Sequence, residues 1–257
     1  MSAAYPNVLC LSGHDPTGGA GIQADIETIA ALGGHALTVI TAHTVQDTGN
    51  VTRVVAPDPR LFKSQIEALL TDCPIHAVKI GLLGETKQVA VIAQVLRRMK
   101  APVVLDPVLR AGGGRNLAAA GLLQAIKTTL LPRVDVLTPN AAEARRLIPG
   151  ARNLDDCGAG LLALGAKNVL ITGGDDAGLA VVNTWHRPGR APRRYSWPRL
   201  HQGFHGAGCT LASAIAVLLA QGHTMAAAIQ DAQAYTQETL KRAVKIGHGR
   251  SVPRRLP

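Results

Sequence analysis

The feature that most constrains this 257-residue sequence is a repeated alternation between short apolar runs and longer segments with helical spacing. Each apolar run has the length of a buried strand, and several end in a polar or glycine-rich loop. Such alternation builds βαβ units with a mainly parallel sheet. Strands are expected in the runs that begin at Asn7, Leu37, His76, Pro102, Val134 and Asn168.

Helices are expected between these runs, and the rhythm changes near the end of the sequence. There "GLAVVNTWHRPG" and "RRYSWPR" resemble a hairpin. Because no linker or internal repeat interrupts the pattern, the sequence predicts one three-layer α/β/α domain over residues 1–257. Its strand ends would place their loops at one edge of the sheet. The predicted helices are 22–32, 59–70, 86–100, 117–131, 141–147, 155–164, 207–220 and 225–244.

Composition excludes several classes of protein. Hydrophobic residues make up 47% and charged residues 17%, which supports a buried core rather than disorder. The net charge of +10 is scattered, apart from a denser run at 187–199, and aromatic residues amount to only 3%. Because no recognition motif accompanies the charge, we expect no nucleic-acid partner. A solvated basic surface and attraction of an anionic substrate both remain open.

Cysteine spacing and hydropathy indicate the compartment. Cys10, Cys73, Cys157 and Cys209 are widely spaced and form no C-x-x-C pair, which argues against zinc and against a disulfide framework. The sequence contains neither a signal-peptide pattern nor an apolar run long enough to span a membrane. We therefore expect a cytoplasmic protein with no membrane partner.

Two loops at predicted strand ends have ligand-binding character. The stretch 12–25, "SGHDPTGGAGIQAD", places four glycines between a strand and a helix, where backbone amides can approach a ligand. It matches neither standard dinucleotide nor P-loop spacing, and a tight turn explains it equally well. Gln46, in "TAHTVQDTG", offers a donor and an acceptor to a heterocycle edge, although most loop glutamines are simply solvated.

A third set of polar residues suits magnesium. Asp106 lies in "LDPV", and Asn140 and Glu143 lie in "LTPNAAEA". Oxygen ligands at strand ends suit Mg²⁺, which usually keeps few protein ligands beside phosphates and waters. Asn140 and Glu143 fit a helix-capping box equally well, and the two roles are compatible.

The stretch 205–216, "HGAGCTLASAIA", places a thiol at a helix start behind a flexible turn. Amides at a helix N-terminus bind anions, and the helix dipole there lowers the pKa of a thiol. Free cysteines are often buried packing residues, and for this segment alone packing is the slightly better explanation.

Taken together and in order, these motifs resemble the ribokinase-type kinases, and within them the hydroxymethylpyrimidine/phosphomethylpyrimidine kinases of thiamine biosynthesis. The resemblance covers nearly the whole chain and rests on the ensemble rather than on any single motif. It is carried by "DPTGGAGIQAD" (15–25), "TVQDT" (44–48), "VKIGLLG" (78–84), "VLDPV" (104–108), "LTPNAAEA" (137–144), "HGAGCTLASAIA" (205–216) and "GHG" (247–249).

This resemblance implies a ribokinase-like fold and two ATP-dependent phosphorylations. The acceptors would be 4-amino-5-hydroxymethyl-2-methylpyrimidine and then its monophosphate. It implies Mg²⁺ with ATP as co-substrate, adds a monovalent cation as a further candidate, and suggests a homodimer, since relatives are commonly dimers. The implied substrate-binding residues are Ala20, Asp25, Gln46, Leu82 and the backbone of Val108.

The same resemblance assigns the reacting groups. The Gly206–Ala207–Gly208 turn would surround the transferred phosphate, and Cys209 would take the place of the aspartate base of most of the superfamily. ATP and phosphate binding would fall to Asp106, Asn140, Glu143 and Thr172, with Asp106 and Glu143 holding the metal, directly or through water.

Three departures from the family pattern bear on activity. Relatives often have a lysine that touches the ATP phosphates where this chain has Thr172, so Arg110 or Arg115 is a candidate replacement. His14 replaces a small hydroxyl residue, and "GAGC" replaces "GTGC". Two alternatives stay open: a pyridoxal-type kinase on the same fold, and a pyrimidine-binding sensor domain without turnover.

Overall fold

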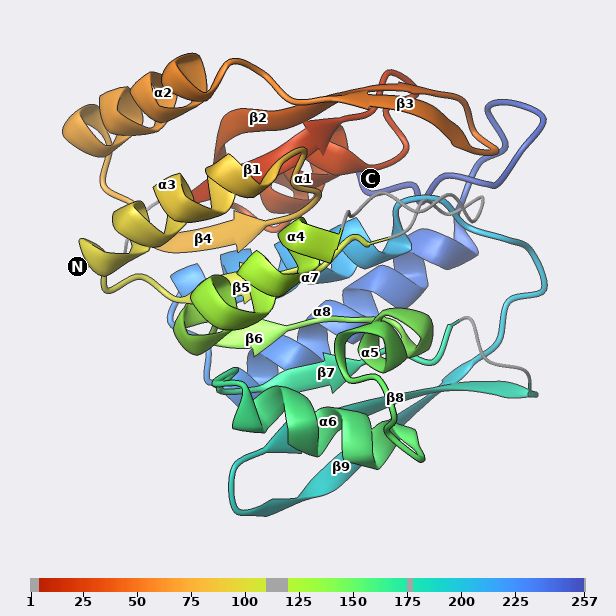
Figure 1. Ribbon diagram of the computed structural model, residues 1–257. Coiled ribbons are helices and arrows are strands. Elements are labelled where there is room, and N and C mark those ends of the chain that lie inside the picture. Colours follow the sequence, from red (N-terminus) through yellow and green to blue (C-terminus); the bar gives the residue numbers. More distant parts are fainter. Residues whose placement is uncertain (1–4, 110–119, 175–177, 257) are drawn as a thin grey trace.

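A nine-stranded, mostly parallel sheet forms the centre of the computed structural model, which describes residues 5–109, 120–174 and 178–256 (Figure 1). The strand order is β3-β2-β1-β4-β5-β6-β7-β8-β9, and pairing is antiparallel only between β2 and β3, β7 and β8, and β8 and β9. The strands are β1 (Asn7–His14), β2 (His35–Gln46), β3 (Val51–Val55), β4 (Ala77–Ile80), β5 (Val103–Leu105), β6 (Val136–Leu137), β7 (Val169–Ile171), β8 (Ala180–Arg187) and β9 (Arg190–Pro198).

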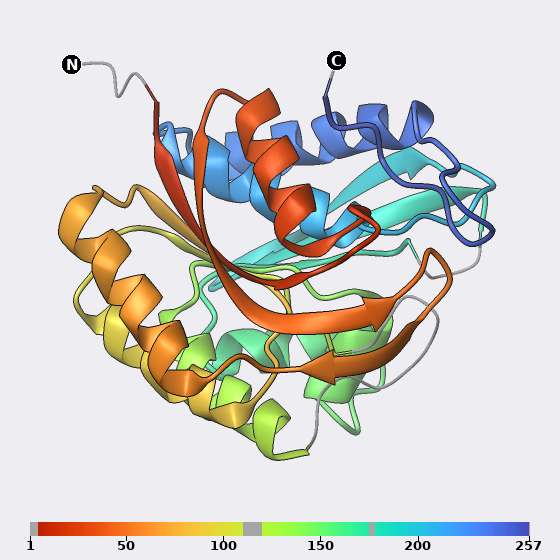
Figure 2. The same ribbon diagram turned by 90° about the horizontal axis from the view of Figure 1, so that it is seen from above.

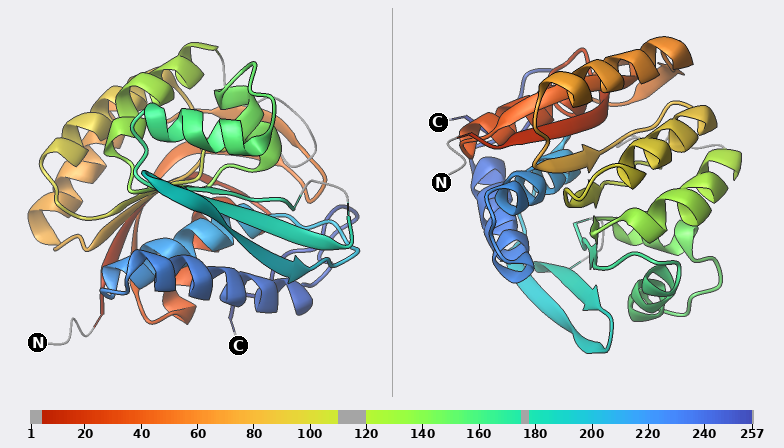
Figure 3. Two further views of the ribbon diagram at one scale, coloured as in Figure 1. Left: turned by 90° about the horizontal axis from the view of Figure 1, so that it is seen from below. Right: turned by 90° about the vertical axis from the view of Figure 1, so that its left-hand side faces the viewer.

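Helices cover both faces of the sheet, as Figures 2 and 3 show. One face carries α1 (Gly21–Ala31), α7 (Ala207–Ala220) and α8 (Met225–Lys241). The opposite face carries α2 (Pro59–Asp72), α3 (Thr86–Arg97), α4 (Ala120–Ala125), a π-helical turn at Ile126–Leu130, α5 (Ala141–Leu147) and α6 (Leu154–Ala163). The predicted three-layer fold with a mainly parallel sheet is therefore confirmed.

The two helix layers are built from different side chains. The face of α2 to α6 packs large aliphatic residues such as Ile66 and Ile92 against the sheet. The opposite face presents Ala212, Ala214 and Ala216 of α7, all fully buried. Small side chains let α7 lie close to the strands, which brings the start of this helix near the strand ends.

The expected helices 141–147 and 207–220 have the predicted bounds, and all six expected parallel strands form. The sequence reasoning missed β3, which pairs with the end of β2 as an antiparallel edge hairpin. The predicted helix 117–131 starts outside the described residues, and its described part changes from α4 to a π-helical turn at Ile126.

Cys10, Cys73, Cys157 and Cys209 are all free thiols. Across the described parts of the chain, none of the helices has both the length and the apolar character needed to cross a membrane.

Candidate active site

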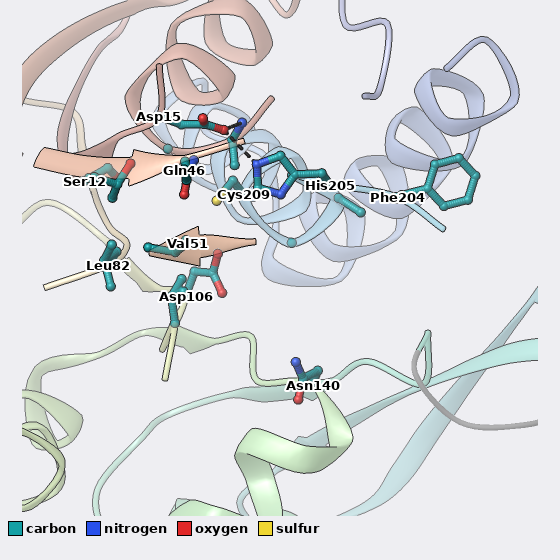
Figure 4. Close-up of a pocket in the computed structure, with 18 of the residues that line it drawn as sticks. Ser12, Asp15, Gln46, Val51, Leu82, Asp106, Asn140, Phe204, His205 and Cys209 are labelled. Atoms are coloured by element: carbon teal, nitrogen blue, oxygen red, sulfur yellow. Dashed lines mark hydrogen bonds and ion pairs between the residues drawn. The ribbon is translucent and has the colours of Figure 1, made fainter. Parts of the chain in front are cut away.

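A cavity of about 270 Å³ opens at the carboxyl ends of the parallel strands (Figure 4). Segments that lie far apart in the sequence meet there, because parallel strands all end at one edge of the sheet. Of the predicted site residues only Asp25 does not line this cavity. Those that do are Ala20, Gln46, Leu82, Asp106, Val108, Asn140, Glu143, Thr172, Gly206, Ala207, Gly208 and Cys209.

Asp25 lies below the cavity rather than in its wall. Its Oδ1 accepts hydrogen bonds from Lys79 Nζ (2.7 Å) and Ser213 Oγ (2.6 Å), and both Asp25 and Lys79 are fully buried. Lys79 also donates to Ser12 Oγ (2.9 Å). The expectation that Asp25 contacts the substrate directly therefore has no counterpart in the cavity wall. Asp25 instead fixes the side chain of Lys79, and Lys79 does line the cavity.

Lys79 stays charged despite its burial. Burial alone would lower the pKa of the Lys79 ammonium, but the negative charge of Asp25, with contributions from Cys209 and Asp106, raises it above its ordinary value. A buried lysine in this state is a fixed positive charge beneath the cavity floor.

Asp15 organises the glycine-rich loop. Its carboxylate accepts hydrogen bonds from the Thr17 amide (2.9 Å), the Ala20 amide (2.8 Å) and His205 Nε2 (2.7 Å). Figure 4 shows the last of these contacts between the loop after β1 and the residue that precedes the α7 turn. Although burial would raise the pKa of the Asp15 carboxyl, the bonds from His205, Gln46 and Thr17 lower it below its ordinary value. The ionised Asp15 thus joins the two loops that line the cavity.

The turn at the start of α7 requires glycine for two reasons. Gly206 has φ +90°, and a Cβ at this position would lie 1.9 Å from Gly19 O. The turn also rests on Arg255, which is 2% exposed. The Arg255 guanidinium donates to Gly19 O, to Thr210 Oγ1 (2.9 Å) and to Glu27 Oε2 (2.9 Å). A buried cation therefore supports the α7 turn from behind.

The structure contradicts the expected low pKa of Cys209. Burial raises the pKa of the Cys209 thiol to about 12, against the lowering effect of Lys79. Desolvation of the thiolate is the largest cause, and the neighbouring carboxylates of Asp106 and Asp25 add to it, whereas the backbone hydrogen bond from Gly21 lowers the pKa. Without substrate, Cys209 is a neutral thiol at neutral pH.

The acidic residues of the cavity have two different tasks. Glu143 N donates to Asn140 Oδ1 (2.8 Å), and Asn140 N donates to Glu143 Oε2 (3.0 Å), so the pair caps α5. Glu143 Oε1 also accepts from Leu109 N (3.2 Å). The Asp106 carboxylate faces the α7 turn instead, because a Cβ on Gly208 would lie 3.6 Å from Asp106 Oδ2. Burial raises the pKa of Asp106 above its ordinary value, although Lys79 opposes this.

One wall of the cavity suits a flat ring. Leu82 closes over Gly13, where a Cβ would lie 2.9 Å from Leu82 Cδ2. Val108 N donates to Asp106 O (2.9 Å), and Val108 also lines the cavity. Gln46 lines the opposite side and bonds to Asp15. An apolar face with polar groups at its edges is what a small heterocycle needs.

A family model described as phosphomethylpyrimidine kinase matches residues 15–254. The chain belongs to this family. The hydroxymethylpyrimidine/phosphomethylpyrimidine kinase of Escherichia coli is 36% identical over 95% of this chain and 94% of its own length. The thiamine biosynthesis bifunctional protein ThiED of Geobacter sulfurreducens is 39% identical over 96% of this chain, which spans 52% of that protein.

Solved structures agree with this assignment. The phosphomethylpyrimidine kinase of Clostridium difficile has 32% identity and a TM-score of 0.79, covering 91% of this chain and 99% of its own. The pyridoxal kinase of Staphylococcus aureus in complex with AMP-PCP and pyridoxal has 26% identity and a TM-score of 0.89, covering 98% of this chain and 94% of its own. The chain is an ATP-dependent kinase with the ribokinase-like fold.

A second cavity, of about 330 Å³, adjoins the first in this kinase. Its wall contains the apolar side chains of Trp197 and Leu211 and a fixed set of amides. Gln233 Oε1 accepts from Asn183 Nδ2 (2.9 Å) and from Trp197 Nε1 (3.1 Å). Apart from Arg199 and Arg250, the described residues that line this cavity are uncharged, which suits the base and sugar of a nucleotide.

Sequence reasoning missed the roles of Asp15, Lys79, His205 and Arg255. A signal existed for Lys79, because a lone charge within the apolar run "HAVKIG" must find a buried partner. Arg255 had no such signal, since its partner Gly19 is 236 positions away. The candidate phosphate-binding residues Arg110 and Arg115 lie outside the described residues.

Proposed function

We propose that this kinase uses the first cavity for two successive phosphorylations, of 4-amino-5-hydroxymethyl-2-methylpyrimidine and then of its monophosphate. Family membership and relatives of nearly equal length make the chain a kinase of thiamine biosynthesis. The observation that carries the proposal is Cys209 in the first turn of α7, beside a cavity wall with Leu82 and Gln46.

The α7 turn and the alcohol would define the reaction geometry. The hydroxymethyl oxygen attacks the γ-phosphorus, the bond from that phosphorus to the β,γ-bridging oxygen breaks, and ADP leaves. Amides of Gly206 to Cys209 would stabilise the charge on the equatorial oxygens, as a helix N-terminus does. Such catalysis depends mainly on positioning, which the Asp15 bonds to both loops would supply.

Cys209 would accept the hydroxyl proton. Lys79 favours the thiolate and burial opposes it, so the positive charge of Lys79 would assist the transfer of the proton to Cys209. In the second phosphorylation the acceptor is already a phosphate, which needs no base. One cavity can therefore serve both reactions, and the role of Cys209 should differ between them.

The residues present fit a magnesium ion. Asp106 places a carboxylate against an anion-binding turn, an arrangement that is repulsive for a bound phosphate unless a cation lies between them. We propose that Asp106 holds Mg²⁺ directly and Glu143 holds it through water, since both Glu143 oxygens accept backbone bonds. When bound, Mg²⁺ would neutralise charge on the ATP phosphates.

The resemblance to the family also supports a homodimer and a cytoplasmic location. It makes a monovalent cation a further candidate cofactor beside Mg²⁺. Val45 and Val55 on the edge hairpin β2–β3 are 57% and 43% exposed, which suits a surface between two copies. Light scattering on the purified protein would give the mass of a dimer. A monomer at micromolar concentration would contradict this part of the proposal.

Release of ADP tests the function directly. With ATP and Mg²⁺, the protein should release ADP with the pyrimidine and with its monophosphate, and more slowly with pyridoxal. The pyridoxal kinase neighbours make pyridoxal the second candidate substrate. ADP release with pyridoxal alone would move the assignment to that substrate, and no ADP above background with any acceptor would leave a binding domain without turnover.

A further inference from the structure

The two cavities meet in a short passage at the start of α7. A nucleotide with its base in the second cavity must cross this passage to bring its terminal phosphate to Cys209. The first turn of α7 contributes two of the shared residues. The residues that line both cavities are Thr172, Gly174, Phe204, Ala207, Gly208 and Arg250.

Arg250 is the one ionisable residue among these shared residues of the described chain. Other basic residues line only one of the two cavities. Lys79 donates to Asp25, and His205 contacts Asp15. Arg199 lines the second cavity, but its guanidinium donates to the carbonyls of the 173–180 segment, at Gly173, Gly174, Gly178 and Ala180.

The backbone of Arg250 is held in place from two sides. Arg250 N donates to Thr48 O (3.0 Å) in the turn between β2 and β3. The next residue, Ser251, donates to Gly203 O (3.0 Å) and accepts from His205 N (2.9 Å). These bonds fix the segment beside the residue that leads into the α7 turn.

The side chain of Arg250 lies over Gly203. A methyl group built on Gly203 would be 3.5 Å from Arg250 Cγ and 4.0 Å from its Nε. The stem is therefore packed, which reduces the entropy lost when the guanidinium binds a ligand. A planar guanidinium offers five donors in a fork that matches the oxygens of a phosphate.

We propose that Arg250 binds the phosphate groups of the nucleotide at this passage. The proposal rests on the proposed function in taking ATP as the phosphate donor. Arg250 would supply the positive charge that phosphoryl transfer needs and that Thr172 cannot supply. Its guanidinium would face the same phosphates as the amides of Ala207 and Gly208, from the other side of the passage.

Two ligands, one with phosphates and one without, distinguish phosphate binding by Arg250 from a packing role. The probes are AMP-PCP and adenosine, titrated calorimetrically into the full chain with Mg²⁺. In Arg250→Gln we expect the Kd of AMP-PCP to rise about 10- to 100-fold, because a charge-assisted bond to phosphate is lost. The Kd of adenosine should stay within twofold. Arg250→Lys keeps the charge and should recover part of the loss.

Turnover gives a second readout. The KM for ATP should rise in Arg250→Gln, whereas the KM for the pyrimidine should change less than threefold. Arg242→Gln is the matched control, because Arg242 is exposed and lines neither cavity. Arg110→Gln and Arg115→Gln test the two candidates that lie outside the described residues.

Three results would overturn the proposal. One is an AMP-PCP affinity of Arg250→Gln within twofold of the parent, and another is an equal loss for adenosine, which would indicate packing. The third is a larger AMP-PCP loss in Arg110→Gln or Arg115→Gln. If the parent protein shows no turnover, the proposed function is wrong. The affinities for AMP-PCP and adenosine would still test whether Arg250 binds phosphate.

Discussion

The two cavities of this kinase differ in how their polar groups are held. In the first cavity, Asp15, Lys79 and Asp106 are almost completely buried and are fixed by neighbours from distant segments. In the second, Trp197 and Gln233 form a neutral wall. On the proposed function, the charged groups of the first cavity would surround the reacting atoms, and the neutral wall would hold the nucleotide.

This difference has an energetic meaning. A buried ion pair such as Lys79–Asp25 contributes little net stability, but removal of one partner leaves an unpaired charge. Substitutions in the first cavity should therefore affect stability and rate together, whereas substitutions near the second should affect nucleotide affinity alone. The following predictions test that contrast.

The largest effect is expected at Cys209. Cys209→Ala should lower the rate of phosphorylation of the free alcohol by about 10²- to 10⁴-fold, the range typical of a lost general base. The rate with the monophosphate should fall less than tenfold, because that acceptor needs no base. Single-turnover rates with each acceptor at saturating ATP measure both values. Equal losses with both acceptors would show that Cys209 only lines the anion-binding turn.

Removal of the buried cation should have the next largest effect. Lys79→Met leaves the Asp25 carboxylate unpaired and should reduce the free energy of unfolding by about 3–5 kcal/mol. Adding Asp25→Asn should restore at least half of the loss. Urea unfolding of the single and double variants measures this coupling.

Arg250→Gln provides the comparison at the passage itself, because Arg250 lines both cavities. Because Arg250 is only half-buried, this change should cost less than about 1 kcal/mol of unfolding free energy. If Lys79→Met costs no more than Arg250→Gln, the contrast between the two cavities does not hold.

A pH-dependent effect is expected at Asp15. Its folded-state pKa is lowered, so its stabilisation is present above its unfolded pKa, about 4, and is lost as the pH falls toward the lower folded value. Asp15→Asn should cost about 1–3 kcal/mol at neutral pH, and the gap from the parent should narrow below about pH 4. Melting temperatures between pH 3 and pH 7 test this, and a gap independent of pH would contradict it.

The sequence predicted features that form between residues close together in the chain better than features that form between distant ones. Asn140 with Glu143 forms a capping box within four residues, and the bounds of α5 followed from it. Gly206 likewise marked the start of α7. The hairpin strand β3 was missed, although the turn segment "DTGN" between valine-containing runs was an available signal.

The chemistry of the site was harder to predict than the residues that form it. The position of Cys209 at the α7 turn followed from the sequence, but its pKa depends on Lys79 and on the degree of burial, which only the packed structure defines. Asp25 was assigned to the substrate through the resemblance to the family. In the structure its carboxylate accepts a hydrogen bond from Lys79, which lies 54 positions away on another strand. The homodimer, the single-domain organisation and the monovalent cation stay predictions.

Because Arg255 bonds to residues near the start of the chain, the site can be completed only late in synthesis. Its partners Gly19 and Glu27 are made early, and Arg255 is made more than two hundred residues later. While the chain is on the ribosome, the strands and α1 can form, but the anion-binding turn has no cation behind it until residue 255 has emerged. A chain that lacks this segment should therefore bind ATP more weakly than the full chain, even where the rest of the domain is folded.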